Sequence, residues 1–419
     1  MIYIRSVCAV IVCLLSFLPD TSAQTTYSLQ KALQVAKENN VLLQAQQLSL
    51  NIAEADVITA KLRPNLHLNN QTLVLMNPSY YPTNTDWSSR RNQQVWWQLT
   101  KTFQAPGQRY NKIDFAQQNV LLTQKVYAAT ERDVFFDVAN KWLQVWIDSK
   151  QMALISEVKE NIDSLVEINK IRYRNQVISE TDLMRTQLLS DQYDLQLIAM
   201  NQTYKSDLII LKAAIGINDS ILVDLNDPLL ISYTTQYDSL LEQALKNRAD
   251  IQVQQATLRV AESNIKLQKS LAWPQAELGA IYNPQNSVPY VGFYGTVELP
   301  VFSRNQGEIK KSYVLKQQAE RNIHAVQFLI RAELLSSYET FNMYRLNLDK
   351  YNSMMAISEK VLGNVRYNYL RGGTNIIDLL EAQRSWLDSQ QQYNSMMSEY
   401  RKSYVQLLYS LGLINQIAQ

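Results

Sequence analysis

The sequence predicts a mainly α-helical protein with a small β part and an internal duplication. Only 10 Gly and 10 Pro interrupt 419 residues, so little in the composition stops long helices. Two segments, 108–173 and 306–369, keep without a break the three- and four-residue spacing of apolar side chains that is typical of a helix. Each segment follows two short stretches in which apolar and polar residues alternate, as they do in β-strands.

The second half of the chain repeats the first. Asp182 recurs as Asp378 and Gly216 recurs as Gly412, in each case 196 residues later. A repeat of this length is a structural unit that stacks on its copy. The predicted boundaries are a first repeat over 24–226 and a second repeat over 227–419.

Residues 1–23 are typical of a secretory signal peptide. Arg5 supplies its positive charge, 7–18 its apolar run, and Thr21-Ser22-Ala23 a cleavage site of small residues. Both cysteines of the chain, Cys8 and Cys13, lie in this segment. We therefore expect an exported mature chain without disulfides, thiolate metal sites or a lipid anchor on its first residue.

The remaining composition narrows the class of protein further. The net charge is +2 and no basic run occurs, so nucleic acid is not an expected partner. After residue 23 no stretch approaches the ~20 apolar residues of a membrane-spanning helix. An exported chain of this kind is either soluble in the periplasm or inserts into a membrane through β-strands.

Each half is expected to start with a helix and to continue with two strands. The first helix covers about 29–62 and stops before Pro64, because proline disfavours a helical conformation at the preceding residue. Pro274 marks the same point in the second half. The expected strands are 65–76 and 93–103 in the first half, and 275–282 and 290–299 in the second.

Alternation along these strands favours a sheet with one apolar and one polar face. Val95, Trp97 and Leu99, for example, stand opposite Gln94, Trp96 and Gln98. About ten residues is the length that a tilted strand needs to cross a bilayer, and aromatic residues gather near the strand ends, as in membrane barrels. Four strands cannot close such a barrel, so a membrane sheet requires oligomerisation. The alternative is two soluble hairpins packed on helices.

After each strand pair, a long helix is expected to fold back on a second helix. A helix of roughly 65 residues is on the order of 100 Å long, so the pattern predicts antiparallel coiled-coil hairpins packed lengthwise. The turns fall at 174–179 and 371–375, and the return helices at 182–214 and 378–411. Gln, Asn, Ser and Tyr fill the polar positions, which suits the wall of a water-filled conduit.

Together these features resemble the TolC family of outer-membrane efflux proteins over the whole mature chain. The duplication, the proline strand entries and the segment 377–383 after Gly372-Gly373 carry the resemblance. The segments 103–109 and 299–307 are similar to the strand-to-helix junctions of the CzcC-like branch, which serves heavy-metal pumps.

The resemblance implies a homotrimer in the outer membrane that extends into the periplasm. Three copies would join four strands each into a twelve-stranded β-barrel, and their helices into a helical barrel. The resemblance also implies a passive exit duct, without catalysis or cofactor, joined through a periplasmic membrane-fusion adaptor to an inner-membrane pump of the RND or ABC type. The implied cargo is heavy-metal cations, with drug export and type I secretion as alternatives.

Asp378 and Glu381 are the first candidates for a periplasmic gate. They are three residues apart, hence on one helix face, and they match the acidic residues that line the constriction in the family. In a trimer they would form carboxylate rings that attract cations. The alternative for Asp378 is a helix cap, because Asn375 stands three residues before it, but capping leaves Glu381 unexplained.

Asp182 and Arg185 hold the corresponding positions of the first repeat. Ser179 stands three residues before Asp182, which is the spacing of a capping box, so capping competes with a role at the gate. Arg185 could pair with a neighbouring carboxylate and latch a closed state, or it could be a solvated surface residue.

The two helical turns are the expected docking tips for the adaptor. Gly372-Gly373 allows positive φ in the second turn. The first turn has no glycine, and Asn175 is expected to take the left-handed conformation instead. The tip residues are Asn175, Gln176 and Val177 in the first turn, and Arg371, Gly372, Gly373 and Thr374 in the second.

Metal ligation and enzymatic chemistry are not expected. His67 and His324 are the only histidines, and neither has a partner at ligand spacing. The methionine pairs 354–355 and 396–397 suit helix packing better than soft-metal binding. No Ser/His/Asp set supports an enzyme. The remaining alternative is a periplasmic coiled-coil protein without a pore.

Overall fold

The computed structural model describes residues 25–228, 236–285 and 288–418. The predicted signal peptide, 1–23, lies outside the described residues. The chain forms two compact units, and each unit combines segments of both halves. The sheet unit contains 45–130 and 245–330, and the hairpin unit contains the other described residues.

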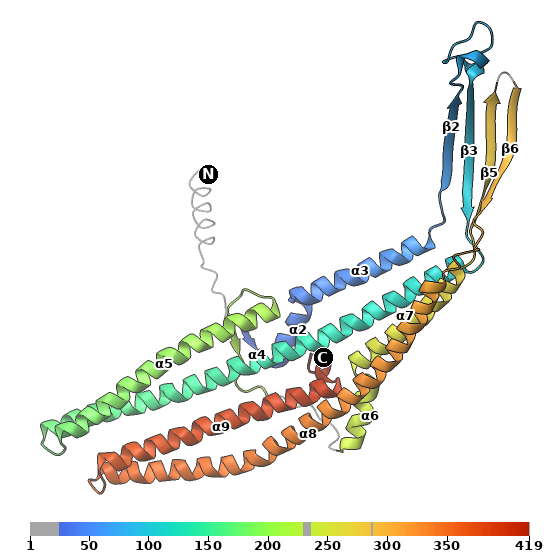
Figure 1. The fold of residues 1–419 in the computed structure, drawn as a ribbon. Coiled ribbons are helices and arrows are strands. Elements are labelled where there is room, and N and C mark those ends of the chain that lie inside the picture. Colours follow the sequence, from blue (N-terminus) through green and yellow to red (C-terminus); the bar gives the residue numbers. More distant parts are fainter. Residues whose placement is uncertain (1–24, 229–235, 286–287, 419) are drawn as a thin grey trace, which may run out of the picture. The chain divides into compact units, whose positions relative to one another are not determined.

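The sheet unit holds a four-stranded antiparallel sheet in the order β2-β3-β5-β6 (Figure 1). The strands are β2 (Leu66–Val74), β3 (Gln93–Phe103), β5 (Ala276–Gln285) and β6 (Val288–Val297). Between β2 and β3 lie the short 3-10 helices η1 (Pro78–Tyr80) and η2 (Arg90–Asn92). The helices of the unit are most of α3 (Val41–Lys61), α7 (Ala249–Leu271), and the adjoining parts of α4 (Gln108–Arg174) and α8 (Gln306–Leu370).

The strand register gives the sheet two chemically different faces. Trp97 pairs with Asn70 on one side and with Tyr282 on the other, and Tyr282 pairs with Val291. The face that contains Trp97, called the apolar sheet face, carries Leu66, Leu68, Val95, Leu99, Phe103, Leu278, Tyr282, Val291, Phe293 and Val297. The opposite face, called the polar sheet face, carries mostly polar residues, which are His67, Asn69, Gln71, Gln98, Thr100, Glu277, Tyr294 and Thr296, together with Leu73, Trp96 and Ile281. Asn70 and Thr72 are polar exceptions on the apolar sheet face. The alternation in the sequence therefore survives in the paired strands.

The pairing of β3 with β5 joins the two halves of the chain. Gly279 lies so close to β3 that a Cβ atom on it would be 2.2 Å from the carbonyl oxygen of Leu99, so no larger residue fits without a shift of the backbone. Beside it, the Thr100 hydroxyl donates to the Glu277 carboxylate. The two halves of the chain are therefore in close backbone contact at the centre of the sheet.

The hairpin unit consists of two long antiparallel helix pairs. α4 folds back on α5 (Glu180–Ile215), α8 folds back on α9 (Ile376–Leu411), and the two turns lie at the same end of the unit (Figure 1). The smaller elements are α2 (Leu29–Asn39), α6 (Tyr237–Asn247), η3 (Ile414–Ala418) and a parallel pair of β1 (Thr25–Tyr27) and β4 (Ile221–Val223). No described helix is both long enough and apolar enough to cross a membrane.

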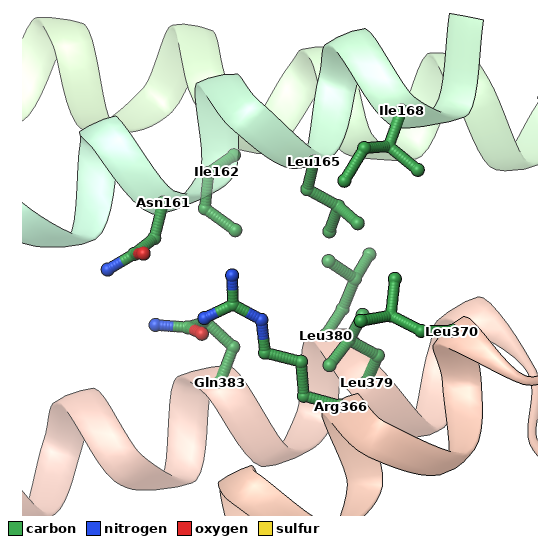
Figure 2. A pocket seen from close by; sticks show the side chains of 9 residues that line it. All are labelled: Asn161, Ile162, Leu165, Ile168, Arg366, Leu370, Leu379, Leu380 and Gln383. Atoms are coloured by element: carbon green, nitrogen blue, oxygen red, sulfur yellow. The ribbon is translucent and has the colours of Figure 1, made fainter. Parts of the chain in front are cut away.

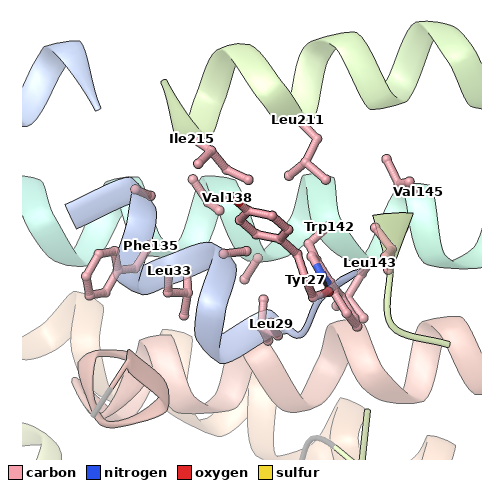
Figure 3. Close-up of a cluster of buried hydrophobic side chains, with 14 of the residues drawn as sticks. Tyr27, Leu29, Leu33, Phe135, Val138, Trp142, Leu143, Val145, Leu211 and Ile215 are labelled. Atoms are coloured by element: carbon pink, nitrogen blue, oxygen red, sulfur yellow. Dashed lines mark hydrogen bonds between the residues drawn. The ribbon is translucent and has the colours of Figure 1, made fainter. Parts of the chain in front are cut away.

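The core of the hairpin unit surrounds the fully buried Trp142 of α4 (Figure 3). The Trp142 indole nitrogen donates to the carbonyl oxygen of Tyr27 at 3.1 Å, which fixes β1 against the helix. Leu211 and Ile215, near the end of α5, pack on the same core and are fully buried. Each such side chain contributes about 1.5–3 kcal/mol of apolar burial. This core fixes the ends of the hairpin helices distant from the turns.

The prediction of one continuous helix over 29–62 is wrong. Asn40 has an extended conformation and separates α2 from α3. Its side-chain oxygen accepts from the backbone N–H of Leu43 at 3.1 Å, and its side-chain nitrogen donates to the carbonyl oxygen of Ala214 at 2.7 Å. Gly216, with a φ of 87°, lies against the backbone of Asn39. The break therefore depends on contacts with the end of α5, which local helix propensity does not reveal.

Candidate gate at the hairpin tips

Both hairpins close in turns of the same conformation. In the second turn Gly372 has a φ of 77°, and the N–H of Gly373 donates to the carbonyl oxygen of Asn368 at 2.9 Å. In the first turn Gln176 has a φ of 60°, and the N–H of Val177 donates to the carbonyl oxygen of Arg172 at 2.9 Å. This hydrogen-bond pattern requires a left-handed residue at one position only.

The expectation that Asn175 takes the left-handed conformation is wrong. The N–H of Asn175 still makes the helical bond to the carbonyl oxygen of Ile171, at 3.1 Å, so the left-handed residue is the next one, Gln176. Gln176 stands 196 residues before Gly372 and adopts the glycine conformation at a steric cost. The tip residues Asn175, Gln176, Val177, Arg371, Gly372 and Gly373 are exposed, and Thr374 is half-buried.

The return helices are capped by the residues that the spacing indicated. In the first repeat, the Ser179 hydroxyl accepts from the N–H of Asp182 at 3.1 Å, and the N–H of Ser179 donates to the Asp182 carboxylate at 3.4 Å, which completes a capping box. In the second repeat, Asn375 accepts from the N–H of Asp378 at 2.9 Å. The Thr374 hydroxyl donates to the Asp378 carboxylate. Both aspartates therefore have a local structural role.

Glu381 differs from the two aspartates. Its side chain is exposed, and within the described part of the chain its carboxylate has no hydrogen-bond or ion-pair partner. Asp378 is exposed on the same face of α9, whereas Leu379, Leu380 and Ala382 on the other face are buried. The first turns of α9 thus present carboxylates on the side that does not pack within the unit.

Arg185 lies beside Asp182 on α5. Its guanidinium nitrogen is 3.6 Å from the Asp182 carboxylate, and both side chains are partly exposed. Within one protomer, Arg185 therefore pairs along its own helix, and no carboxylate of the second hairpin appears as its partner among the described residues. An exposed pair of this kind contributes less than about 1 kcal/mol to stability.

A buried polar contact joins the two hairpins near their tips. The Tyr369 hydroxyl of α8 donates to the Asn169 side-chain oxygen of α4 at 2.8 Å. The Asn169 side-chain nitrogen donates to the Thr186 hydroxyl of α5 at 2.9 Å. The Arg172 guanidinium lies 4.7 Å from the Tyr369 ring centre and donates to the Tyr369 carbonyl oxygen at 3.2 Å. Three helices are therefore linked through groups that are protected from water.

Sequence reasoning did not identify this contact. In the sequence, Arg172-Tyr173 matches Arg366-Tyr367 of the second half, but such a match predicts no contact. The contact pairs residues 200 positions apart, and only the packing of the hairpins brings them together. An apolar cluster surrounds it and consists of Leu154, Ile155, Val158, Ile162, Leu165, Val166, Leu189, Tyr193, Tyr369, Ile376, Leu379, Leu380, Trp386 and Leu387.

A second unpredicted feature is a carboxyl pair between α4 and α5. Asp148 accepts from the Gln144 side-chain nitrogen at 3.0 Å, and its second carboxylate oxygen is buried. Burial, together with hydrogen bonding and charge repulsion from Asp207, raises the pKa of Asp148 to about 6. Lys402 of α9 lowers it in part. The Asp148 carboxyl therefore keeps its proton to a higher pH than an ordinary aspartate does.

The described residues contain no group of three His, Cys, Asp or Glu side chains that could hold a metal ion. Two long helical hairpins and a sheet with two different faces make up the described part of the chain. The family model described as outer membrane efflux protein matches residues 32–217 and 240–413, and the chain belongs to this family. The predicted resemblance to TolC-like proteins is confirmed. Members of the family are channels and not enzymes, and the protein lies in the outer membrane.

Several solved structures share the fold. VceC from Vibrio cholerae has 16% identity and a TM-score of 0.72, over 92% of this chain and 96% of that chain. CusC has 17% identity and a TM-score of 0.76, over 92% of each chain. The open state of the MtrE outer membrane channel of Neisseria gonorrhoeae has 16% identity and a TM-score of 0.72, over 92% of this chain and 89% of that chain. None of the curated proteins matches the chain.

Proposed function

We propose that three copies of this chain form the exit duct of a tripartite efflux system. The observation that carries the proposal is the sheet, which has two different faces and two open edges, β2 and β6. Inside a bilayer every backbone N–H and C=O group needs a partner, so an open strand edge cannot persist there. Pairing β6 of one copy with β2 of the next closes twelve strands into a barrel and removes all edges.

The two sheet faces support this orientation. On the apolar sheet face Phe293 is 99% exposed within one chain, which lipid contact would relieve. The polar sheet face would line the water-filled lumen. Lys101, the one charged residue on the apolar sheet face, stands near the helix end of β3 and lies 5.8 Å from the Phe103 ring centre. That position suits a side chain which reaches the headgroup region.

Asp378 and Glu381 are the proposed gate residues. Their exposed face on α9 is free within the protomer, so three copies could place six carboxylates around the duct. Such rings would attract cations and narrow the mouth of the duct. Asp182 and Arg185 hold the equivalent positions in the first hairpin, and their ion pair would stabilise the tip of that hairpin. The Tyr369–Asn169 contact would hold the second hairpin against the first in the closed state.

The exposed tips are the proposed docking points for the other components. Residues 175–177 and 371–374 would contact a periplasmic membrane-fusion adaptor, which connects the duct to an inner-membrane pump of the RND or ABC type. We propose heavy-metal cations as the cargo, because the junction segments 103–109 and 299–307 are similar to those of the CzcC-like branch, which serves heavy-metal pumps. Greater metal sensitivity of a deletion strain, with unchanged drug sensitivity, would support this cargo. The reverse pattern would favour drug export.

The gate is tested by conductance in planar bilayers. The wild-type protein is expected to give small, cation-selective currents. Replacing Asp378→Ala together with Glu381→Ala removes the carboxylates and is expected to raise conductance several-fold and to reduce cation selectivity. Glu359→Ala, which removes an exposed carboxylate from α8, is the matched control and should leave both properties unchanged. Equal conductance of the wild type and the double variant would refute the gate.

A further inference from the structure

A small cavity lies between the two hairpins, within the apolar cluster near the tips (Figure 2). Its volume is about 40 Å³, slightly more than the roughly 30 Å³ that one water molecule occupies in the liquid. Ile162 and Leu165 of α4 form one wall, and Leu379 and Leu380 of α9 form the other. The space therefore fits a group of the size of a carboxylate, between apolar walls.

One buried hydrogen-bond donor at this cavity lacks an acceptor, and an exposed arginine lies beside it. Gln383 of α9 is only 7% exposed, and its side-chain nitrogen is buried without an acceptor in the described part of the chain. A buried donor in this condition costs about 1–3 kcal/mol until a partner satisfies it. The Arg366 guanidinium extends from α8 toward α4, beside Gln383 (Figure 2). No ion pair to Arg366 occurs among the described residues.

The charge at the cavity has one sign. None of the residues that line it carries a carboxylate, so Arg366 gives the site a single positive charge. Asn161, the remaining polar residue, already donates its side-chain N–H to the carbonyl oxygen of Glu157 at 3.0 Å. The missing chemical group is thus an acceptor with one negative charge and an apolar substituent.

We propose that this cavity binds a small alkyl carboxylate. Arg366 would donate to one carboxylate oxygen and Gln383 to the other, as charge-assisted hydrogen bonds. The first methylene groups would contact the leucine and isoleucine walls, and the rest of the chain would leave through the open side. Since α4, α8 and α9 all line the site, the bound carboxylate would join the two hairpins in their present arrangement. This inference rests on the cavity alone and holds whether or not the protein exports metals.

The test is a titration of the purified full chain with sodium hexanoate, read as a change in thermal unfolding temperature. We expect a saturable rise with hexanoate and none with 1-hexanol or with sodium chloride at the same ionic strength. Arg366→Gln and Gln383→Leu should each weaken the apparent affinity at least tenfold. Arg345→Gln, an exposed arginine of α8 away from the cavity, is the matched control and should bind as the wild type does.

A second measurement keeps the test independent of variant stability. The carboxyl ¹³C signal of labelled hexanoate should broaden with the wild-type protein and sharpen again with Arg366→Gln. An equal response to 1-hexanol, no saturation, or unchanged binding in both variants would overturn the proposal. Conductance plays no part in either readout, so failure here is separate from failure of the gate.

Discussion

Tyr369 supplies the hydroxyl of the polar contact between the hairpins. Tyr369→Phe removes the hydroxyl and leaves the fully buried Asn169 oxygen without its donor. We expect a loss of about 1–3 kcal/mol, because a buried acceptor is left unsatisfied. The thermal unfolding temperature should fall, and the open fraction in planar bilayers should rise. Tyr367→Phe, an exposed tyrosine of the same helix, should change neither quantity.

Asp148 makes stability depend on pH near neutrality. Its folded pKa of about 6 lies above the ordinary value of 3.8, so the folded protein binds the proton first. The free energy of unfolding from this group therefore increases as pH falls from 6 to 3.8, and the full cost of the ionised Asp148 carboxylate is present above 6. Asp148→Asn should stabilise the protein at pH 7.5, by on the order of 1 kcal/mol after allowance for partial exposure, and the gain should shrink to roughly half at pH 5, because the unfolded aspartate stays ionised down to its ordinary pKa of 3.8.

The comparison of Asp148→Asn with the wild type at each pH isolates this group from other titrating residues. Asp349→Asn, which changes an exposed aspartate of α8, serves as the control and should give the same small difference at both pH values. An Asp148→Asn variant that is equally stable relative to wild type at pH 5 and pH 7.5 would contradict the assignment.

At the scale of single residues, the sequence predicted what depends on neighbours along the chain. Ser179 and Asn375 cap the return helices, and both caps follow from the three-residue spacing to Asp182 and Asp378. The left-handed conformation of Gln176 was missed because asparagine has the higher intrinsic preference, whereas the hydrogen bonds of the turn fix the position. Tyr369, Asp148 and the donors at the cavity could not be predicted, because each depends on a residue from another helix.

At the scale of elements, β6 allows the membrane orientation to be tested by neighbouring residues. Phe293 lies on the apolar sheet face and Tyr294 on the polar sheet face. Phe293→Arg should cost about 2–4 kcal/mol, since an arginine would face lipid near the middle of the bilayer. The measurement is the amount of protein that folds into the outer membrane, and the variant should reduce it strongly.

Tyr294→Arg is the matched control for this substitution. It introduces the same charge one residue later, toward the lumen, and should be tolerated. Equal loss of folded protein in both variants would show that the apolar sheet face does not contact lipid while the polar sheet face contacts water. Equal tolerance of both variants would show that β6 does not lie in the membrane.

Long elements were predicted well because their periodic patterns are local. The helices α4 and α8 begin at the predicted residues, 108 and 306, since polar and glycine-containing turns precede them. The break at Asn40 was missed because asparagine inside a helical pattern has only a weak local effect. Its cause is the contact with Ala214, which becomes available only when α5 has packed beside α2.

At the scale of the whole molecule, the proposed trimer predicts the mass of the purified particle. Native mass spectrometry in detergent should give three times the mass of one mature chain, where the full sequence has 48.3 kDa. Monomers should be absent from the folded fraction, because the edges β2 and β6 would be left open. A stable folded monomer in detergent that still forms channels would contradict the twelve-stranded arrangement.

The open edges of the four-stranded sheet have a genetic consequence. If no single chain can complete its backbone hydrogen bonds in the bilayer, insertion and assembly are one event, and its rate depends steeply on the local concentration of chains. One defective protomer then disables the two normal copies with which it assembles. In a cell that makes normal and Phe293→Arg chains in equal amounts, random mixing would leave only about one trimer in eight intact, so the substitution would act as a dominant-negative allele.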